Sequence, residues 1–225
     1  MSKVIFVISI SLDGFISGAN VRPEAGLGDG GEQLHEWNNS KDPRTREIVE
    51  SYENTGATIV GRTTYDLSIP YWGADGPLGA ARLPTVVVSH SVPQDVPQDS
   101  VYRFVNGVEE ALETAKKAAG EKDISISGAN VAQQFLTRGL IDEIAIHLVP
   151  VLFGSGTRLF EGLGDTHSAR TAGGGRNTRR DAPALPHREV MWSRWTFVCC
   201  IQKEQENEQR CVVCLGVSGR VHRRT

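Results

Sequence analysis

The chain has 225 residues, of which 39% are hydrophobic, and its formal net charge at pH 7 is −3. This length is enough for one sizeable core, and the mild negative charge gives no reason to expect nucleic acid or an anionic membrane as a partner. No apolar run approaches the ~20 residues that span a bilayer, and the N-terminal apolar run is not followed by a signal-peptide cleavage pattern, so we expect a cytoplasmic protein.

The first part of the chain predicts strands and helices in alternation. Residues 4–10 are apolar at nearly every position, which predicts a buried strand that ends in a flexible turn. Residues 19–40 are rich in Gly, Asn and Pro and predict a long loop, of a length that is usually functional or mobile. A helix is expected to begin at Pro43 and to end at Gly56, and residues 57–61 then predict a short buried strand.

The alternation continues up to the region around residue 165. An amphipathic helix pattern is clearest over residues 107–120. The remaining strands are expected at 83–91, 101–107, 123–127 and 141–154, and the remaining helices or turns at 62–73 and 130–139. Strands that alternate with helices predict an α/β fold with a central, mostly parallel sheet and helices on both faces.

Three of the expected strands end in small or hydroxyl-bearing residues before a helix or turn begins, at 61–64, 89–91 and 128–131. In a parallel sheet the ligand crevice lies at the carboxyl ends of the strands, where the unpaired N–H groups of a helix's first turn favour phosphate. A glycine lets the phosphate approach the main chain, and the guanidinium of Arg62 can bind a second phosphate. Two phosphate sites predict a dinucleotide with an extra 2′-phosphate, which is NADPH.

Each of these features also has a plain structural interpretation. A glycine corner is more often only a tight turn between a strand and a helix, and an arginine at a helix start is more often solvated than bound to a ligand. Their joint occurrence in one α/β chain favours the coenzyme site.

Four segments of the chain together resemble the dihydrofolate-reductase-like family. They are "SLDGFISG", "GRTTYD", "VVVSHS" and "ISGANVAQQFLTRGLIDEIAIHLVPVLFGSGTRLFEGL". The resemblance is strongest to the branch related to the reductase domain at the C-terminus of the riboflavin-biosynthesis deaminase/reductase, and it covers residues 3–165. It implies a largely parallel sheet of about eight strands whose last strand is antiparallel, with NADPH as the hydride donor.

The resemblance also implies roles for individual positions. The adenosine side of the coenzyme, including the 2′-phosphate, would contact Gly61, Arg62, Thr63, Thr64, Ser89 and His90. The diphosphate would contact Gly128, Ala129, Asn130 and Val131. The turn near the nicotinamide and the substrate would be Asp13 and Gly14. The substrate side of the cleft would be bounded by Pro150, Gly154 and Ser155.

Asp13 is the best single candidate for a polar group near the hydride, because hydride transfer to a C=N or C=O bond needs a proton nearby. The alternative is an Asp-Gly turn whose carboxylate caps its own backbone. His90 could neutralise a phosphate or be solvated. His35 and Trp37 could cover the substrate or belong to a loosely ordered loop tip. His147 sits in an alternating strand and is more often a packed or edge histidine.

The substrate stays open at this point. The riboflavin-pathway reductase carries an acidic residue just before the paired glycines that correspond to the corner at 128–131. This chain has Ile126-Ser127 there. Arg158 is the obvious candidate for a substrate phosphate. True dihydrofolate reductases carry an acidic residue on their first helix that pairs with the pteridine ring. The candidates here are Glu47, Glu50 and Glu53, and none of them stands in a convincing pattern. An electron-poor heterocycle of the riboflavin-precursor, pterin or flavin type is therefore expected.

The end of the chain differs in composition from the rest. It holds all four cysteines, which are Cys199, Cys200, Cys211 and Cys214. A zinc site needs two pairs of ligands at suitable spacing, and adjacent cysteines do not form a good half-site. A redox C-x-x-C usually opens a helix, which "CVVCLGVSG" does not predict. We therefore expect no metal.

A change of reading frame explains this tail better. The family that the chain resembles ends, after a segment like "LFEGL", with two strands joined by a "PGVTHLRYR"-like turn. This chain reads "HSARTAGGGRNTRRDAPALPHREVM" instead. Back-translated and read one base later, with permitted wobble bases, residues 169–191 spell "HELQVVEETPGVTHLRYRTVK" and then a stop. We therefore expect a frameshift just after residues 166–168.

The sequence thus predicts a reductase domain over residues 1–168 and an out-of-frame or disordered tail over 169–225. The main functional hypothesis is an NADPH-dependent oxidoreductase that acts on a small heterocycle. The alternatives are an NADPH-binding protein without turnover, through family drift or the damaged C-terminus, and a zinc or redox module in the tail. The expected partners are a small-molecule substrate and a second copy in a homodimer, with neither nucleic acid nor membrane.

Overall fold

The computed structural model describes residues 2–39, 41 and 43–161, together with the short segments 169–170, 202–203 and 209–212. Most of the tail therefore lies outside the described residues, and so do the frameshift prediction and three of the four cysteines, all but Cys211. In the part of the chain that is described, no helix is long and apolar enough to cross a membrane.

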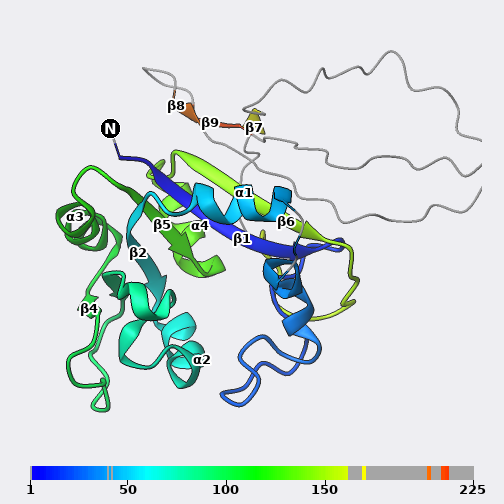
Figure 1. Ribbon diagram of the computed structural model, residues 1–225, viewed down its shortest axis with the longest axis horizontal. Coiled ribbons are helices and arrows are strands. Elements are labelled where there is room, and N and C mark those ends of the chain that lie inside the picture. The colour runs from blue at the N-terminus through cyan, green and yellow to red at the C-terminus, as the bar shows by residue number, and fades with distance from the viewer. Residues whose placement is uncertain are drawn as a thin grey trace, which may run out of the picture.

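A six-stranded sheet forms the centre of the molecule (Figure 1). Its strands are β1 (Val4–Ser11), β2 (Thr55–Gly61), β3 (Thr85–Val88), β4 (Tyr102–Val105), β5 (Asp123–Ser127) and β6 (Glu143–Val149). Their spatial order is β4-β3-β2-β5-β1-β6, and every neighbouring pair is parallel. The predicted α/β fold is confirmed. The antiparallel last strand that the resemblance implies is not among the strands of this sheet.

The helices and the minor strands complete the list of elements. The α-helices are α1 (Pro43–Ser51), α2 (Arg62–Trp72), α3 (Val108–Ala119) and α4 (Ala129–Thr137). Short 3-10 helices are η1 (Gly31–Leu34), η2 (Glu36–Asn39), η3 (Gly73–Asp75) and η4 (Gly79–Ala81). Three short strands, in the order β7-β9-β8, are β7 (Ala169–Arg170), β8 (Gln202–Lys203) and β9 (Gln209–Val212).

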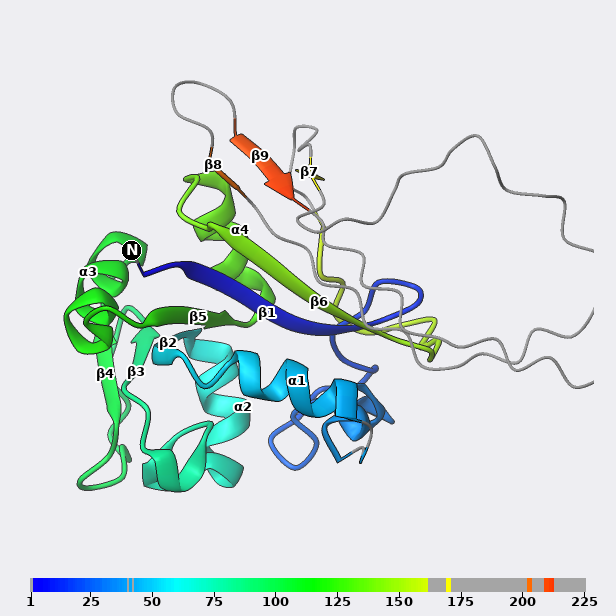
Figure 2. The same ribbon diagram turned by 45° about the horizontal axis from the view of Figure 1, so that its top comes forward.

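Helices cover both faces of the large sheet, as predicted (Figure 2). On one face, alternate strand residues such as Phe6 and Ile126 pack against α3 and α4, where Phe135 is fully buried. On the other face, Val60 packs with Tyr65 of α2. Each fully buried apolar side chain of this size contributes about 1.5–3 kcal/mol relative to exposure, so the two layers fix the positions of the strand ends.

The helix predicted to end at Gly56 is shorter than expected. α1 ends at Ser51, and Gly56 lies inside β2. A Cβ at Gly56 would lie 2.8 Å from the Cα of Ala119 in α3. This glycine therefore permits a close approach of strand and helix and does not terminate α1.

Two further boundaries differ from the prediction. The strand expected over 141–154 ends at Val149, because Pro150 has no N–H group to continue a ladder. The loop expected over 19–40 contains η1 and η2 and is fixed near its start, where Arg22 forms an ion pair with Asp29 at 2.9 Å. The hydrogen bond from Asn20, followed by the contact with Arg22, lowers the pKa of Asp29.

Candidate active site

The predicted site residues gather at one edge of the sheet because all six strands are parallel. The carboxyl ends of β3, β2, β5, β1 and β6 follow one another in that order. They lead directly into Ser89, Arg62, Gly128, the turn at Asp13 and Pro150. Five segments that are far apart in the sequence thus form one continuous edge, which is where α/β folds bind their ligands.

The two glycine corners of this edge touch each other. Gly128 has φ +101°, and a Cβ at this position would overlap the hydroxyl oxygen of Thr64. A Cβ at Gly61 would be in ordinary contact with Val131, at 3.7 Å from its Cβ. The start of α2 and the start of α4 therefore lie side by side, and the glycine at residue 128 is required both by its conformation and by its neighbour.

Both helix starts present main-chain N–H groups to this edge. The N-cap residues of α2 and α4 are glycines, and neither end has a side-chain cap. The first N–H groups of a helix have no partner inside the helix and carry a partial positive charge. Asn130 is exposed and accepts a hydrogen bond from Gln134, whereas Val131 is buried in the core and can contribute only its main chain.

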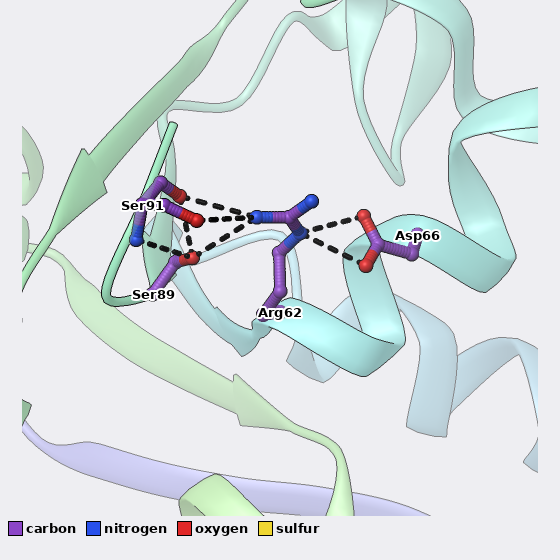
Figure 3. A network of polar contacts seen from close by, with 4 residues as sticks. All are labelled: Arg62, Asp66, Ser89 and Ser91. Atoms are coloured by element: carbon purple, nitrogen blue, oxygen red, sulfur yellow. Dashed lines mark hydrogen bonds and ion pairs between the residues drawn. The ribbon is translucent and has the colours of Figure 1, made fainter. Parts of the chain in front are cut away.

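Arg62 is held from two sides (Figure 3). Its Nε donates to both carboxylate oxygens of Asp66, at 2.7 and 2.9 Å. Its Nη1 donates to the hydroxyl of Ser89 at 3.3 Å and to the carbonyl oxygen of Ser91 at 3.1 Å. An exposed ion pair of this kind adds little stability, so its main effect is to orient the guanidinium between the ends of β2 and β3.

The other predicted residues of this half of the site are more exposed. Thr63 and His90 lie at the surface. The Nδ1 atom of His90 and the side-chain oxygen of Asn106 are 2.9 Å apart, which ties the ends of β3 and β4 together. His90 lies on the same strand end as Ser89.

The carboxylate of Asp13 is occupied by hydrogen bonds. It accepts from the hydroxyl of Ser11 at 2.6 Å, from the amide of Gly154 at 2.7 Å and from the amide of Phe153 at 3.2 Å. The bond from Ser11, followed by the two amides, lowers the pKa of Asp13 to about 2. Asp13 is therefore ionised at neutral pH and joins the turn after β1 to the segment after β6.

The substrate-side residues follow β6. Gly154 has φ +70°, and Pro150, Gly154 and Ser155 are exposed. Arg158 donates from Nη1 to the carbonyl oxygen of Asp13 at 3.3 Å, and its guanidinium lies 4.4 Å from the ring centroid of Phe15. The backbone of Gly14, which has φ +87°, accepts a hydrogen bond from the amide of Leu159 at 3.0 Å. Asp13, Gly14 and the substrate-side segment are thus brought together.

Sequence reasoning missed the residues that support this edge. The contact of Asp66 with Arg62 has a signal in its spacing, since opposite charges four residues apart on a helix are neighbours. The contact of Ser91 with Arg62 has no such signal, although the segment 89–91 was predicted to lie at this edge. No group of three or more potential metal ligands occurs among the residues with assigned positions.

Comparisons with known proteins show the family to which the chain belongs. The family model of the RibD C-terminal domain matches residues 2–175. The uncharacterized protein YwjB of Bacillus subtilis (strain 168) is 28% identical over 172 residues, which are 76% of this chain and 90% of YwjB.

Solved structures also resemble the chain. A crystal structure named "Putative riboflavin biosynthesis protein", from Shewanella sp. PV-4, is 28% identical with a TM-score of 0.54, covering 74% of this chain and 87% of that one. The dihydrofolate reductase of Enterococcus faecalis, complexed with NADP(H) and RAB-propyl, is 18% identical with a TM-score of 0.45, over 71% of this chain and 77% of that one.

The match over residues 2–175 covers most of the chain, so the family resemblance found in the sequence is confirmed. The chain belongs to the family of the RibD C-terminal domain.

Proposed function

We propose that the protein is an NADPH-dependent oxidoreductase that transfers a hydride to a small heterocyclic substrate of the riboflavin-precursor, pterin or flavin type. The observation that carries this proposal is the contact between the two glycine corners, with Arg62 beside them. One edge of the sheet then offers two separate binding positions for phosphate groups, which a dinucleotide with a 2′-phosphate requires.

The residues of this edge fit the coenzyme. The N–H groups at the start of α4, next to Gly128, would bind the diphosphate, because the N-cap residue Gly128 has no side chain to cap this end and a Cβ would obstruct the approach. Arg62 would bind the 2′-phosphate, with Ser89 beside it. When bound, the nicotinamide supplies the hydride.

Asp13 would act by holding the substrate side of the cleft in place. Its ionised carboxylate has no proton to give at neutral pH, and its hydrogen bonds join the turn after β1 to Phe153 and Gly154. The proton that accompanies the hydride would therefore come from water or from another group. The absence of a proton on the Asp13 carboxylate at neutral pH also favours the second candidate function, which is NADPH binding without turnover.

Titration of the full chain with NADPH and with NADH, followed by nicotinamide fluorescence, tests the proposal. Arg62→Ala should weaken NADPH binding by about 10- to 100-fold, because a hydrogen-bonded charge pair contributes about 1.5–3 kcal/mol. NADH binding should change by less than about threefold, since this coenzyme lacks the 2′-phosphate. Arg82→Ala, which removes an exposed arginine that is paired with Asp75, is the matched control.

Equal loss of both coenzymes in Arg62→Ala would contradict the 2′-phosphate role. Turnover assays with dihydrofolate, flavin mononucleotide and a pyrimidine substrate then separate the two candidate functions. NADPH oxidation with any of these substrates supports the reductase, and tight coenzyme binding with no turnover supports the idle binder.

A further inference from the structure

A buried polar and aromatic cluster lies on the α1 side of the sheet. Ser9 of β1 and His147 of β6 are register partners, and both are buried. Trp37 of η2 donates from Nε1 to the Ser9 hydroxyl at 3.0 Å, and its ring centroid lies 4.2 Å from that of His147. The Tyr52 hydroxyl is 2.8 Å from Nε2 of His147. Residues from four separate segments, one of which carries the imidazole, thus form one cluster.

One nitrogen of this imidazole has no hydrogen-bond partner in the part of the chain that the structure describes. His147 is 2% exposed, yet its Nδ1 atom makes no hydrogen bond to any of these residues. A buried polar atom without a partner costs about 1–3 kcal/mol, and native proteins keep few of them. Burial, with a smaller contribution from His35, lowers the pKa of His147 to about 4. The ring is therefore neutral, and Nδ1 is available as a hydrogen-bonding atom and not as a charge.

The cluster is close to the edge that holds the predicted site. Ser9 and Ser11 lie on the same face of β1, two residues apart, which corresponds to about 7 Å along a strand. The hydroxyl of Ser11 binds the carboxylate of Asp13 in the turn at the strand end. A planar molecule that contacts His147 would thus extend towards the turn at Asp13 and Gly14.

We propose that Nδ1 of His147 is the hydrogen-bonding group with which this protein recognises the ring edge of a planar nitrogen heterocycle. The rings of Trp37 and Tyr52 pack against the imidazole, and the hydrogen bond between the Tyr52 hydroxyl and Nε2 sets the orientation of the imidazole. The inference rests on the proposed function, since it names the residue that binds the substrate of the same reductase.

Two amide substitutions separate the two nitrogens of the ring. The side-chain amide of asparagine lies near the position of Nδ1, whereas that of glutamine reaches the position of Nε2. His147→Asn therefore keeps a hydrogen-bonding group for the ligand and loses the bond to Tyr52. His147→Gln keeps the bond to Tyr52 and loses the group for the ligand. Tyr52→Phe, which keeps the aromatic ring, is the control for the Nε2 bond.

The experiment measures dissociation constants of the full-length protein for dihydrofolate, flavin mononucleotide and 2,4-diaminopyrimidine, and separately for NADPH. We expect the wild type to bind at least one of the three heterocycles. His147→Gln should weaken that binding about tenfold or more, while His147→Asn and Tyr52→Phe stay within about threefold. NADPH binding should be unchanged in all variants.

Three results would overturn the inference. They are a greater loss in His147→Asn than in His147→Gln, an equal loss in both, and a wild type that binds none of the three heterocycles. The first would show a structural role through Tyr52. Because NADPH is titrated separately, each of these results leaves the proposed coenzyme site standing, whereas loss of NADPH binding by the wild type would reject the proposed function itself.

Discussion

The carboxylate of Asp13 connects two segments that are 141 residues apart, the turn after β1 and the main chain at Gly154. Its pKa is lowered from 3.8 to about 2, so the folded state favours the ionised form. The resulting stability is fully present above the ordinary pKa of 3.8 and is lost as the pH falls towards 2. Asp13→Asn should therefore lower the melting temperature at pH 7 by a few degrees, measured by calorimetry.

The pH dependence distinguishes this role from a loss of packing. The difference in melting temperature between the wild type and Asp13→Asn should shrink steadily between pH 5 and about pH 2. Ser11→Ala removes the largest cause of the shift, so the pKa of Asp13 should rise towards 3.8 in that variant. A difference that stays constant over this pH range would rule out the ionised carboxylate as its cause.

Individual residues also show where sequence reasoning ends. The Gly-Arg-Thr-Thr pattern predicted a helix start with Arg62 at the strand end, and α2 begins at this residue. The orientation of its guanidinium depends on Ser91, which comes from a different strand end, and no local pattern predicts that contact. Similarly, alternation along β6 predicted a packed His147, but its stacking on Trp37 depends on the path of a loop.

At the scale of elements, the corner between β5 and α4 carries the next prediction. Gly128→Ala introduces a Cβ at φ +101° that overlaps the Thr64 hydroxyl. The strain of the positive φ alone costs about 1–3 kcal/mol, and the overlap pushes α2 away from α4. We expect a loss of stability in urea unfolding above about 1 kcal/mol and a weakening of NADPH binding of about tenfold or more.

Two variants show whether the overlap with Thr64 or the strained backbone causes the effects of Gly128→Ala. Gly120→Ala places a Cβ at φ +63° with nothing within 4 Å, so it should cost stability without changing NADPH binding. Thr64→Ala combined with Gly128→Ala removes the overlap and should recover part of the affinity. NADPH binding that is unaffected by Gly128→Ala would mean that the corner does not approach the diphosphate.

Element types were predicted better than their ends. The strand and helix order followed from hydrophobic periodicity, which each segment carries locally. The end of α1 was not predicted correctly, because Gly56 looks like a helix terminator in the sequence. Its actual role depends on Ala119, which is brought close only by the packing of α3 on β2. Tertiary contacts of this kind are invisible to local patterns.

At the scale of the whole molecule, the comparisons bear on the tail. The aligned region makes up 90% of YwjB but 76% of this chain, and the family match ends at residue 175. This chain thus carries additional sequence beyond the part that it shares with YwjB. The proposal of a changed reading frame after residues 166–168 accounts for that sequence and for the cysteines within it. The coding DNA tests it directly, since codons that exclude the shifted peptide would reject it.

A rebuilt chain provides the physical test. Residues 169–225 are replaced by "HELQVVEETPGVTHLRYRTVK", which should supply two strands beside β6, the strand at the edge of the six-stranded sheet. Burial of only two more apolar side chains adds about 3 kcal/mol to the free energy of unfolding. This increase raises the melting temperature of a chain of this size by about 6–12 °C. A replacement with the same residues in scrambled order is the control. If both replacements melt at the same temperature, the added segment is not the native partner of this edge, because a scrambled segment has lost the alternation that places apolar side chains on the buried face.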